Sequence, residues 1–134
     1  MARQTINPDD MYNAVQFGFS HAAKSSGGTT IELAGQVAWD DNGDLVGKDD
    51  LAAQAAQAFR NLKKVLAAAG ATPDDVTRIR TYVVNYSADK IPAIGAAIAE
   101  FYGGNTPAPN TLLGVEALAM PEFLIEIEAT AVID

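Results

Sequence analysis

The sequence has 134 residues, of which 49% are hydrophobic and 19% charged, and these values predict one soluble domain spanning residues 1–134. Acidic residues outnumber basic ones by 17 to 9, and the net charge of −8 disfavours nucleic-acid partners. No apolar run is long enough to cross a bilayer, and residues 1–8 lack a signal peptide's hydrophobic segment. With no cysteine and one histidine, a thiolate metal site or a Ser-His-Asp triad is disfavoured. We therefore expect a cytoplasmic protein with no membrane partner and no metal.

The N-terminal part of the sequence predicts strands separated by turns. Residues 1–10 indicate a flexible or edge segment that ends in turn residues. Aromatic and β-branched residues in 12–22 predict a strand, and 29–39 predict a second strand that forms a hairpin with the first. Gly35 lies inside the second strand, where glycine indicates a bulge or the close approach of another group to the backbone.

Two amphipathic helices are predicted in the middle of the chain. The first begins at Asp49-Asp50, where acidic side chains suit the positive end of the helix dipole, and ends at Gly70. A strand follows over 76–86, with Arg80 and Tyr82 on one face. The second helix begins near Ser87 or Asp89 and ends at Gly103-Gly104.

Residues 107–133 predict two further strands joined by a short connection at 120–122. In the second of these strands, Ile125 and Ile127 point one way, whereas Glu126 and Glu128 point the other. Two carboxylates on one face of an apolar strand indicate either a solvent-exposed face or the wall of a polar cleft.

The predicted order of elements is ββαβαββ, which belongs to the α+β class. Two helices can cover only one face of such a sheet. The other face carries Glu126, Arg80 and Tyr82 beside apolar residues, and we expect copies of the same chain to bury it. The sequence therefore predicts a homo-oligomer.

Several short stretches, taken in order, resemble the Rid (YjgF-type) family of reactive-intermediate deaminases. The resemblance runs from about residue 15 to residue 132. The matching stretches are AGQV (34–37), DDLAAQ (49–54), FRNL (59–62), LAAAG (66–70), YVV (82–84), FY (101–102), GV (114–115) and IEIEA (125–129). The resemblance implies a chorismate-mutase-like α+β fold with a mixed sheet. It also implies a homotrimer whose sheets form a central barrel, with clefts between neighbouring subunits.

The resemblance also implies a chemistry and a set of site residues. Active members of the family hydrolyse enamine and imine intermediates to keto acid and ammonia, and they need no cofactor. In the family motif an arginine after Pro-Ala pairs with the substrate carboxylate, and a glutamate in the last strand positions or activates water. The glutamate position is Glu126, whereas the arginine position is Asn110. A cysteine, an asparagine and a serine of many members are replaced here by Leu112, Gly95 and Ala34.

With Asn110 at the arginine position, the chain resembles an arginine-lacking branch of the family. A neutral amide supplies neither the charge nor the rigid two-pronged donor of arginine, so we expect a substrate other than the usual aminoacrylate. Glu126 is the candidate acid/base, or else an exposed strand carboxylate. Asn110 either binds the ligand or shapes a turn. Arg80 either compensates for the missing arginine or pairs with Glu126 or Glu128.

The remaining candidates concern the walls of the cleft. Backbone groups near Gly35 and Leu112 are expected to hold the substrate, and Tyr12 and Phe17 either shape the pocket or belong to the core. Two functions remain open: hydrolysis of a small enamine or imine, and non-catalytic binding of a small metabolite by the same trimer. Ribonuclease activity fits poorly with the acidic charge and the single histidine.

Overall fold

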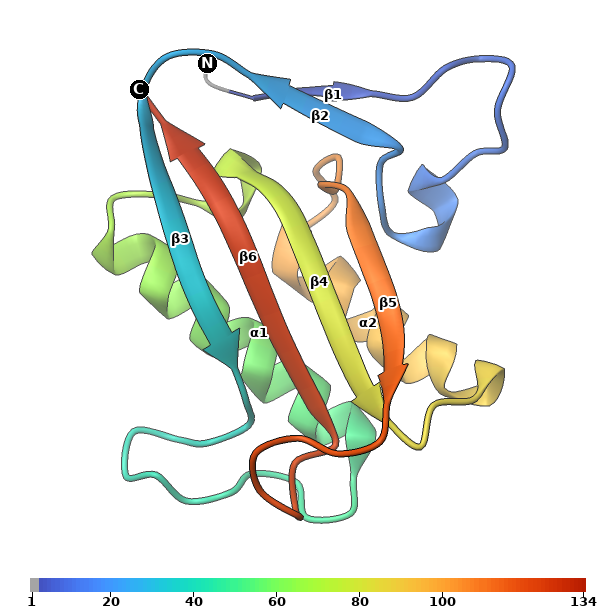
Figure 1. The fold of residues 1–134 in the computed structure, drawn as a ribbon, viewed down its shortest axis with the longest axis vertical. Coiled ribbons are helices and arrows are strands. Elements are labelled where there is room, and N and C mark those ends of the chain that lie inside the picture. The colour runs from blue at the N-terminus through green and yellow to red at the C-terminus, as the bar shows by residue number, and fades with distance from the viewer. Residues whose placement is uncertain (1–2) are drawn as a thin grey trace.

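The computed structural model describes residues 3–134, which form two sheets and two α-helices (Figure 1). The label η marks a short 3-10 helix. In chain order the elements are β1 (Arg3–Ile6), η1 (Val15–Phe17), β2 (Ala22–Ser25), β3 (Thr29–Gln36), α1 (Leu51–Ala68), η2 (Pro73–Asp75), β4 (Val76–Val84), η3 (Ala88–Lys90), α2 (Ile91–Tyr102), β5 (Asn110–Val115) and β6 (Ile125–Ile133). This composition confirms the α+β class.

The larger sheet has four strands in the order β3-β6-β4-β5. β6 pairs antiparallel with both β3 and β4, whereas β5 pairs parallel with β4, so the sheet is mixed as expected. β1 and β2 form a separate antiparallel pair that lies across one end of the larger sheet (Figure 1).

Both helices cover the same face of the larger sheet (Figure 1). The side chains of β4 and β6 alternate between buried and half-buried, which matches the alternation read from the sequence of β6. The core between the layers includes Phe59, Leu62, Leu66, Ile79, Val83, Ile98, Phe101, Ile125 and Ile127. No helix within residues 3–134 has the combination of length and apolar character needed to cross a membrane.

Both predicted helices are confirmed, and their ends follow from local chemistry. The Asp50 side chain accepts a hydrogen bond from the backbone N–H of Ala53 at 3.1 Å, which caps the start of α1. Gly103 ends α2 with a φ of 60°, a conformation that glycine adopts without steric cost.

The predicted strand over 12–22 is wrong. This segment contains the short helix η1, and a strand begins only at Ala22. β2 pairs with β1 rather than with β3, so the predicted hairpin is also wrong, and the chain has one strand more than the ββαβαββ order allows. The physical reason is that Tyr12 and Phe17 are not strand core residues: both are exposed, and they line a cavity beside β5.

The two C-terminal strands are confirmed, but they are not neighbours in the sheet. β4 lies between β5 and β6, and the connection runs from residue 116 to residue 124 rather than over three residues. The helix α2 carries the chain back so that β5 runs parallel to β4, and β6 then returns antiparallel on the other side.

Gln54 joins the two loops at one end of the sheet. Its side chain is fully buried, and its Nε2 donates to the carbonyls of Gly47 and Glu122, both at 3.0 Å. Its Oε1 accepts from the backbone N–H of Leu124 at 2.9 Å. One side chain of α1 therefore fixes the loop that leads into β6.

Candidate functional site

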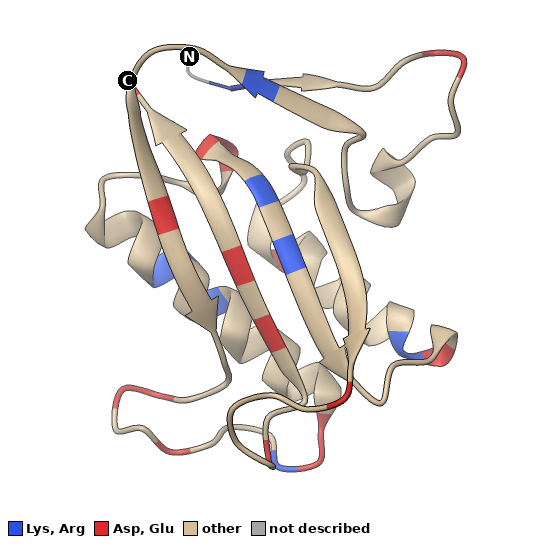
Figure 2. Cartoon of the chain, in the orientation of Figure 1, with Lys and Arg blue, Asp and Glu red and all other residues tan. Residues whose placement is uncertain are grey.

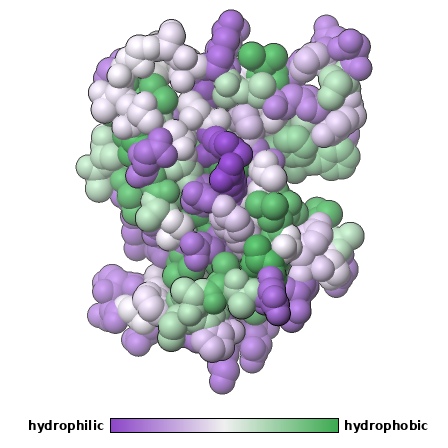
Figure 3. All heavy atoms as spheres, in the orientation of Figure 1, coloured by the Kyte–Doolittle hydropathy of each residue, from purple (hydrophilic) through white to green (hydrophobic). Residues whose placement is uncertain are grey.

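The face of the larger sheet that the helices leave uncovered carries both acidic and basic side chains. Figure 2 shows acidic positions on β3 and β6 and basic positions on β4. In the register of the sheet, Tyr82 lies opposite Glu126 and Arg80 lies opposite Glu128. Figure 3 views this face and shows hydrophilic and hydrophobic residues side by side on it. The uncovered face therefore combines charged and apolar side chains.

Glu128 is engaged within the chain. The Tyr82 hydroxyl donates a hydrogen bond to Glu128 Oε1. This bond to the carboxylate, together with desolvation, raises the pKa of Tyr82, while Arg80 acts in the opposite direction. The geometry gives Glu128 a structural role and places Arg80 beside the same pair.

Glu126 lies against the backbone of β3. The pairing of β3 with β6 shifts register between Leu33 and Gln36, and a β-carbon on Gly35 would lie 1.9 Å from Glu126 Oε2. The bulge and the close approach expected at Gly35 are thus confirmed. Within residues 3–134 no hydrogen bond or ion pair engages the half-buried Glu126 carboxylate, so its oxygens are available to water or a ligand.

A cavity of about 420 Å³ lies between the start of β5, helix α2 and the segment that contains η1. It brings together four residues predicted from the sequence: Tyr12, Phe17, Asn110 and Leu112. In Figure 3 the outline of the molecule is hollowed at the right, below the N-terminal segment. The other lining residues are Phe19, Ile91, Ile94, Gly95, Ile98 and Thr111. We call this space the β5 cavity.

Asn110 is the polar residue whose orientation the structure fixes best in the β5 cavity. Its Oδ1 accepts a hydrogen bond from Thr81 Oγ1 at 3.1 Å, and Thr81 is fully buried. Because the carbonyl oxygen of the amide is engaged, the amide NH₂ group is left as the donor. Asn110 therefore offers hydrogen-bond donors but no charge.

Asn110 and Glu126 lie on opposite faces of the sheet. Asn110 is opposite Ile79, which is buried against the helices, whereas Glu126 is opposite Tyr82 on the uncovered face. Neither Glu126 nor Arg80 is among the residues that line the β5 cavity. Within one chain the predicted site residues therefore form two groups, one beside β5 and one beside the Gly35 bulge.

A second cavity, of about 310 Å³, adjoins the β5 cavity and shares Asn110 and Thr111 with it. It is lined by Arg78, an exposed cation that the sequence did not single out, and by His21. His21 Nε2 lies 2.9 Å from the backbone carbonyl of Tyr12. This contact joins a residue that lines the second cavity to one that lines the β5 cavity. Arg78 rather than Arg80 is thus the arginine beside Asn110.

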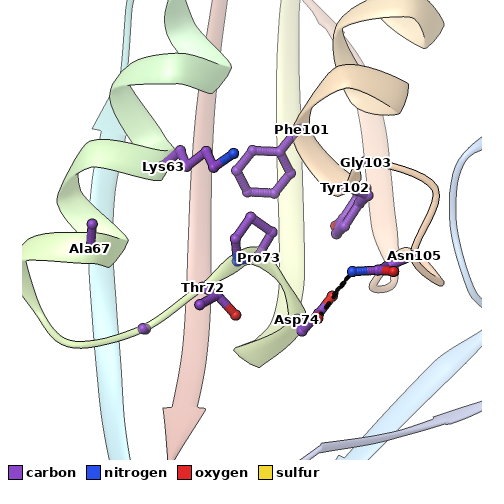
Figure 4. A pocket seen from close by; sticks show the side chains of 10 residues that line it. Lys63, Ala67, Thr72, Pro73, Asp74, Phe101, Tyr102, Gly103 and Asn105 are labelled. Atoms are coloured by element: carbon purple, nitrogen blue, oxygen red, sulfur yellow. Dashed lines mark hydrogen bonds between the residues drawn. The ribbon is translucent and has the colours of Figure 1, made fainter.

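A third cavity, of about 420 Å³, opens between the C-terminal ends of the two helices (Figure 4). Two of its polar residues already bind each other, since Asn105 donates to both carboxylate oxygens of Asp74 at 3.1 Å. It contains none of the predicted site residues. Across residues 3–134 no group of three or more histidine, cysteine or acidic side chains is arranged to hold a metal ion.

The sequence missed several walls of the β5 cavity. Phe19 lies in the segment 12–22, for which composition predicts a strand. The apolar pattern of α2 does not distinguish isoleucines that pack in the core from isoleucines that line a cavity. One signal was present: Gly95 interrupts an otherwise apolar helix, and a glycine at such a position calls for a reason beyond helix formation.

Comparison with known proteins places these features in a family. The family model described as "Endoribonuclease L-PSP" matches residues 12–133. A 2-iminobutanoate/2-iminopropanoate deaminase of Dermatophagoides farinae is 32% identical over 107 residues, which cover 80% of this chain and 80% of that protein. A RutC family protein of Pyrococcus horikoshii is also 32% identical, over 84% of this chain and 85% of that protein.

Solved structures agree in both fold and sequence. A Yersinia pestis protein, YyfB, described as a protein of unknown function of the conserved Rid family, is 58% identical with a TM-score of 0.96, and the match covers 99% of this chain and 100% of that one. Rv2704 of Mycobacterium tuberculosis, a member of the YjgF/YER057c/UK114 family, is 30% identical with a TM-score of 0.63, over 98% and 100% of the two chains. The chain described here therefore belongs to the Rid (YjgF-type) protein family.

Proposed function

We propose that the protein hydrolyses a small enamine or imine to a carbonyl compound and ammonia, without a cofactor, in clefts between copies of the chain. The observation that carries the proposal is the position of Glu126: its carboxylate is half-buried, held against Gly35 and not engaged by other residues of the described chain. A deaminase relative at 32% identity supports the same class of reaction.

The proposed chemistry needs one base and a positioned water. Glu126 accepts a proton from water as the water oxygen attacks the imine carbon, which forms a carbinolamine. The proton then returns to the nitrogen, which completes the carbinolamine. The carbon–nitrogen bond breaks while the hydroxyl proton of the carbinolamine passes through Glu126 to the nitrogen, so that ammonia leaves as the carbonyl forms. An enamine enters the same route after its carbon gains a proton from solvent and its nitrogen loses one to solvent, which gives the imine. Water supplies the oxygen atom of the product, so the step requires no redox partner.

The proposed cleft combines residues of two chains. Since Asn110 and Glu126 face opposite sides of the sheet, they reach one ligand only if the uncovered face of one copy meets the β5 cavity of another. We propose a homotrimer in which three larger sheets form a central barrel, as the family resemblance implies. The mixed polar and apolar character of the uncovered face supports its burial between copies.

We further propose that the substrate is not the usual aminoacrylate. Asn110 occupies the position of the arginine that pairs with the substrate carboxylate in active relatives. The loss of a charge-assisted bidentate pair costs about two decades in affinity for such a substrate. The net charge of −8 likewise disfavours RNA, although the family model is described as an endoribonuclease.

The test is a comparison of two carboxylates on the same strand. Imines and enamines that carry different side chains are generated in situ, and their decay is followed with the wild-type protein, Glu126→Gln and Glu128→Gln. We expect Glu126→Gln to lower kcat at least about a hundredfold, because it removes the general base, and Glu128→Gln to retain most of the activity. Equal rates in wild type and Glu126→Gln would reject the catalytic role.

Two further outcomes separate the alternatives. Ligand binding without any acceleration of imine decay indicates a non-catalytic, metabolite-binding member of the family. Mixing inactive Glu126→Gln subunits with inactive Asn110→Leu subunits is expected to restore activity, since some mixed clefts then hold both native residues. A monomeric mass by light scattering, for a protein that is fully active under the same conditions, contradicts the shared cleft.

A further inference from the structure

We propose that the β5 cavity binds an uncharged, apolar portion of the ligand and that Gly95 sets the size of that portion. The inference rests on the proposed function for the choice of site, and it adds the class of compound that the site takes. It is carried by the lining of the cavity, by the orientation of Asn110 and by the glycine in α2.

The lining of the β5 cavity is apolar and carries no formal charge at neutral pH. Three aromatic rings form one wall: the ring of Tyr12 lies 6.5 Å from that of Phe17 and 6.4 Å from that of Phe19. Three isoleucines of α2 (Ile91, Ile94 and Ile98) also line the cavity. Arg78 lines only the adjoining cavity, so a carboxylate placed among the groups of the β5 cavity loses hydration and gains no cation from its walls. An apolar group, by contrast, gains from leaving water. The cavity therefore favours a neutral occupant.

Asn110 adds a single kind of polar contact. With its Oδ1 held by Thr81, its NH₂ group donates to an acceptor on the ligand. A neutral carbonyl, amide or imine nitrogen is such an acceptor. One neutral donor group orients a ligand but does not replace the charge and fork of an arginine for a carboxylate.

Gly95 has no structural reason to be a glycine. It lies in the middle of α2, where alanine is the better helix former, and it does not have a positive φ. A β-carbon built at this position meets no atom within 4 Å, so packing does not exclude a side chain either. Gly95 lines both the β5 cavity and an adjoining cavity of about 440 Å³ between η1 and α2. Its effect is to leave that space open.

The volume limits the occupant to a small molecule. About 420 Å³ is near the lower end of the range for small-molecule sites, and the lining of apolar walls with few polar groups is typical of them. A single ring or a short branched chain, joined to a hydrogen-bond acceptor, matches this space.

Calorimetric titration with phenylacetamide and phenylacetate tests the inference, because the two probes share a ring and differ in charge. We expect the wild-type protein to bind the amide at least about tenfold more tightly than the carboxylate, a difference of about 1.4 kcal/mol. Gly95→Leu is expected to weaken amide binding at least about tenfold by filling the cavity, and Gly95→Ala to weaken it less. Ala96→Leu adds the same side chain to an exposed neighbour on α2 and should leave binding unchanged.

Several results overturn the inference. The inference fails if the wild-type protein binds neither probe, or if it binds phenylacetate as tightly as phenylacetamide or more tightly. It also fails if Gly95→Leu binds phenylacetamide as tightly as the wild type does. A phenylacetate preference that disappears in Arg78→Gln would assign a carboxylate site to the adjoining cavity instead. A change in oligomeric mass in Gly95→Leu, with unchanged affinity per intact site, would mean that a second copy fills the cavity. By contrast, amide binding that depends on Gly95 in a protein that hydrolyses no imine rejects the proposed function and leaves this inference standing.

Discussion

A β-carbon at position 35 would lie 1.9 Å from Oε2 and 2.6 Å from Cδ of Glu126, so the bulge of β3 and the carboxylate of β6 fit together only because residue 35 is glycine. Gly35→Ala should leave the fold intact, because the displaced atoms belong to the end of a flexible side chain. The carboxylate itself must move, and we expect imine hydrolysis to slow by about a hundredfold. Steady-state kinetics, with circular dichroism to confirm folding, measures the effect.

A double variant provides the control for this pair. If Gly35→Ala acts through the carboxylate, then Gly35→Ala combined with Glu126→Gln should be no slower than Glu126→Gln alone. Additive losses would show instead that Gly35 affects catalysis by a separate route.

Asn110→Arg should move the ligand preference of the β5 cavity toward carboxylates. The guanidinium supplies the charge and the paired donors that the amide lacks, and we expect phenylacetate to bind about ten- to a hundredfold more tightly than to the wild type. Asn110→Gln is the matched control, since it lengthens the side chain without adding charge. Unchanged phenylacetate affinity in Asn110→Arg would mean that position 110 does not face the bound ligand.

Tyr102 makes the stability of the fold decrease as the pH becomes alkaline. Burial raises the pKa of its hydroxyl from 10.0 to about 12, so the unfolded chain loses this proton at a lower pH than the folded chain. The contribution is fully present below pH 10 and is lost as the pH rises from 10 to about 12, by on the order of 2 to 3 kcal/mol. Urea unfolding at a series of pH values should show a shallower alkaline decline for Tyr102→Phe than for the wild type.

The same variant has a cost at neutral pH. The backbone N–H of buried Ala108 donates to the Tyr102 hydroxyl at 3.2 Å, and Tyr102→Phe leaves that donor unpaired at a cost of about 1 to 3 kcal/mol. Tyr86→Phe, at an exposed tyrosine, is the control for both effects. An alkaline decline that is equally steep in Tyr102→Phe would assign it to other groups.

Gln54→Leu should destabilise the protein although the residues are similar in size. The change leaves two partly buried carbonyls and one backbone N–H without the partner that Gln54 supplies, and we expect a loss of about 3 kcal/mol in the free energy of unfolding. Gln57→Leu, one turn along the same helix, removes a single hydrogen bond to Asn61 and should cost less. Chemical denaturation measures the free energy of unfolding of both variants. Equal losses would contradict the role of Gln54 in joining the two loops.

The regular parts of the fold were predictable because their patterns are local. The apolar stripe of α1, its cap at Asp50 and the alternation around Ile125 and Ile127 each lie within one element. Segment 12–22 has the composition of a strand, but its aromatic side chains line a cavity, and composition does not distinguish these uses. The insertion of β6 between β3 and β4 depends on pairing between distant parts of the chain, so no local pattern reveals it.

The candidate site divides in the same way. The close approach at Gly35 followed from a glycine inside a strand, and the family pattern pointed to Asn110 and Glu126. Their separation onto opposite faces required the register of three strands. The position of Arg78 beside Asn110 could not be predicted from the sequence, because it arises from the parallel pairing of β4 with β5.

The central place of β6 also governs how the chain folds during synthesis. Ile125–Ile133 is made after the other strands described here, yet β3 has no other partner in the larger sheet and β4 pairs with β6 along most of its length. Until then β3 lacks its partner in the sheet, and the apolar faces of the helices have an incomplete sheet to cover. Thr29 pairs with Ile133, a residue far along the chain, so this part of the sheet forms only after translation has passed residue 133. The larger sheet is therefore expected to close only after β6 has been made, with β3 unpaired in that sheet until then.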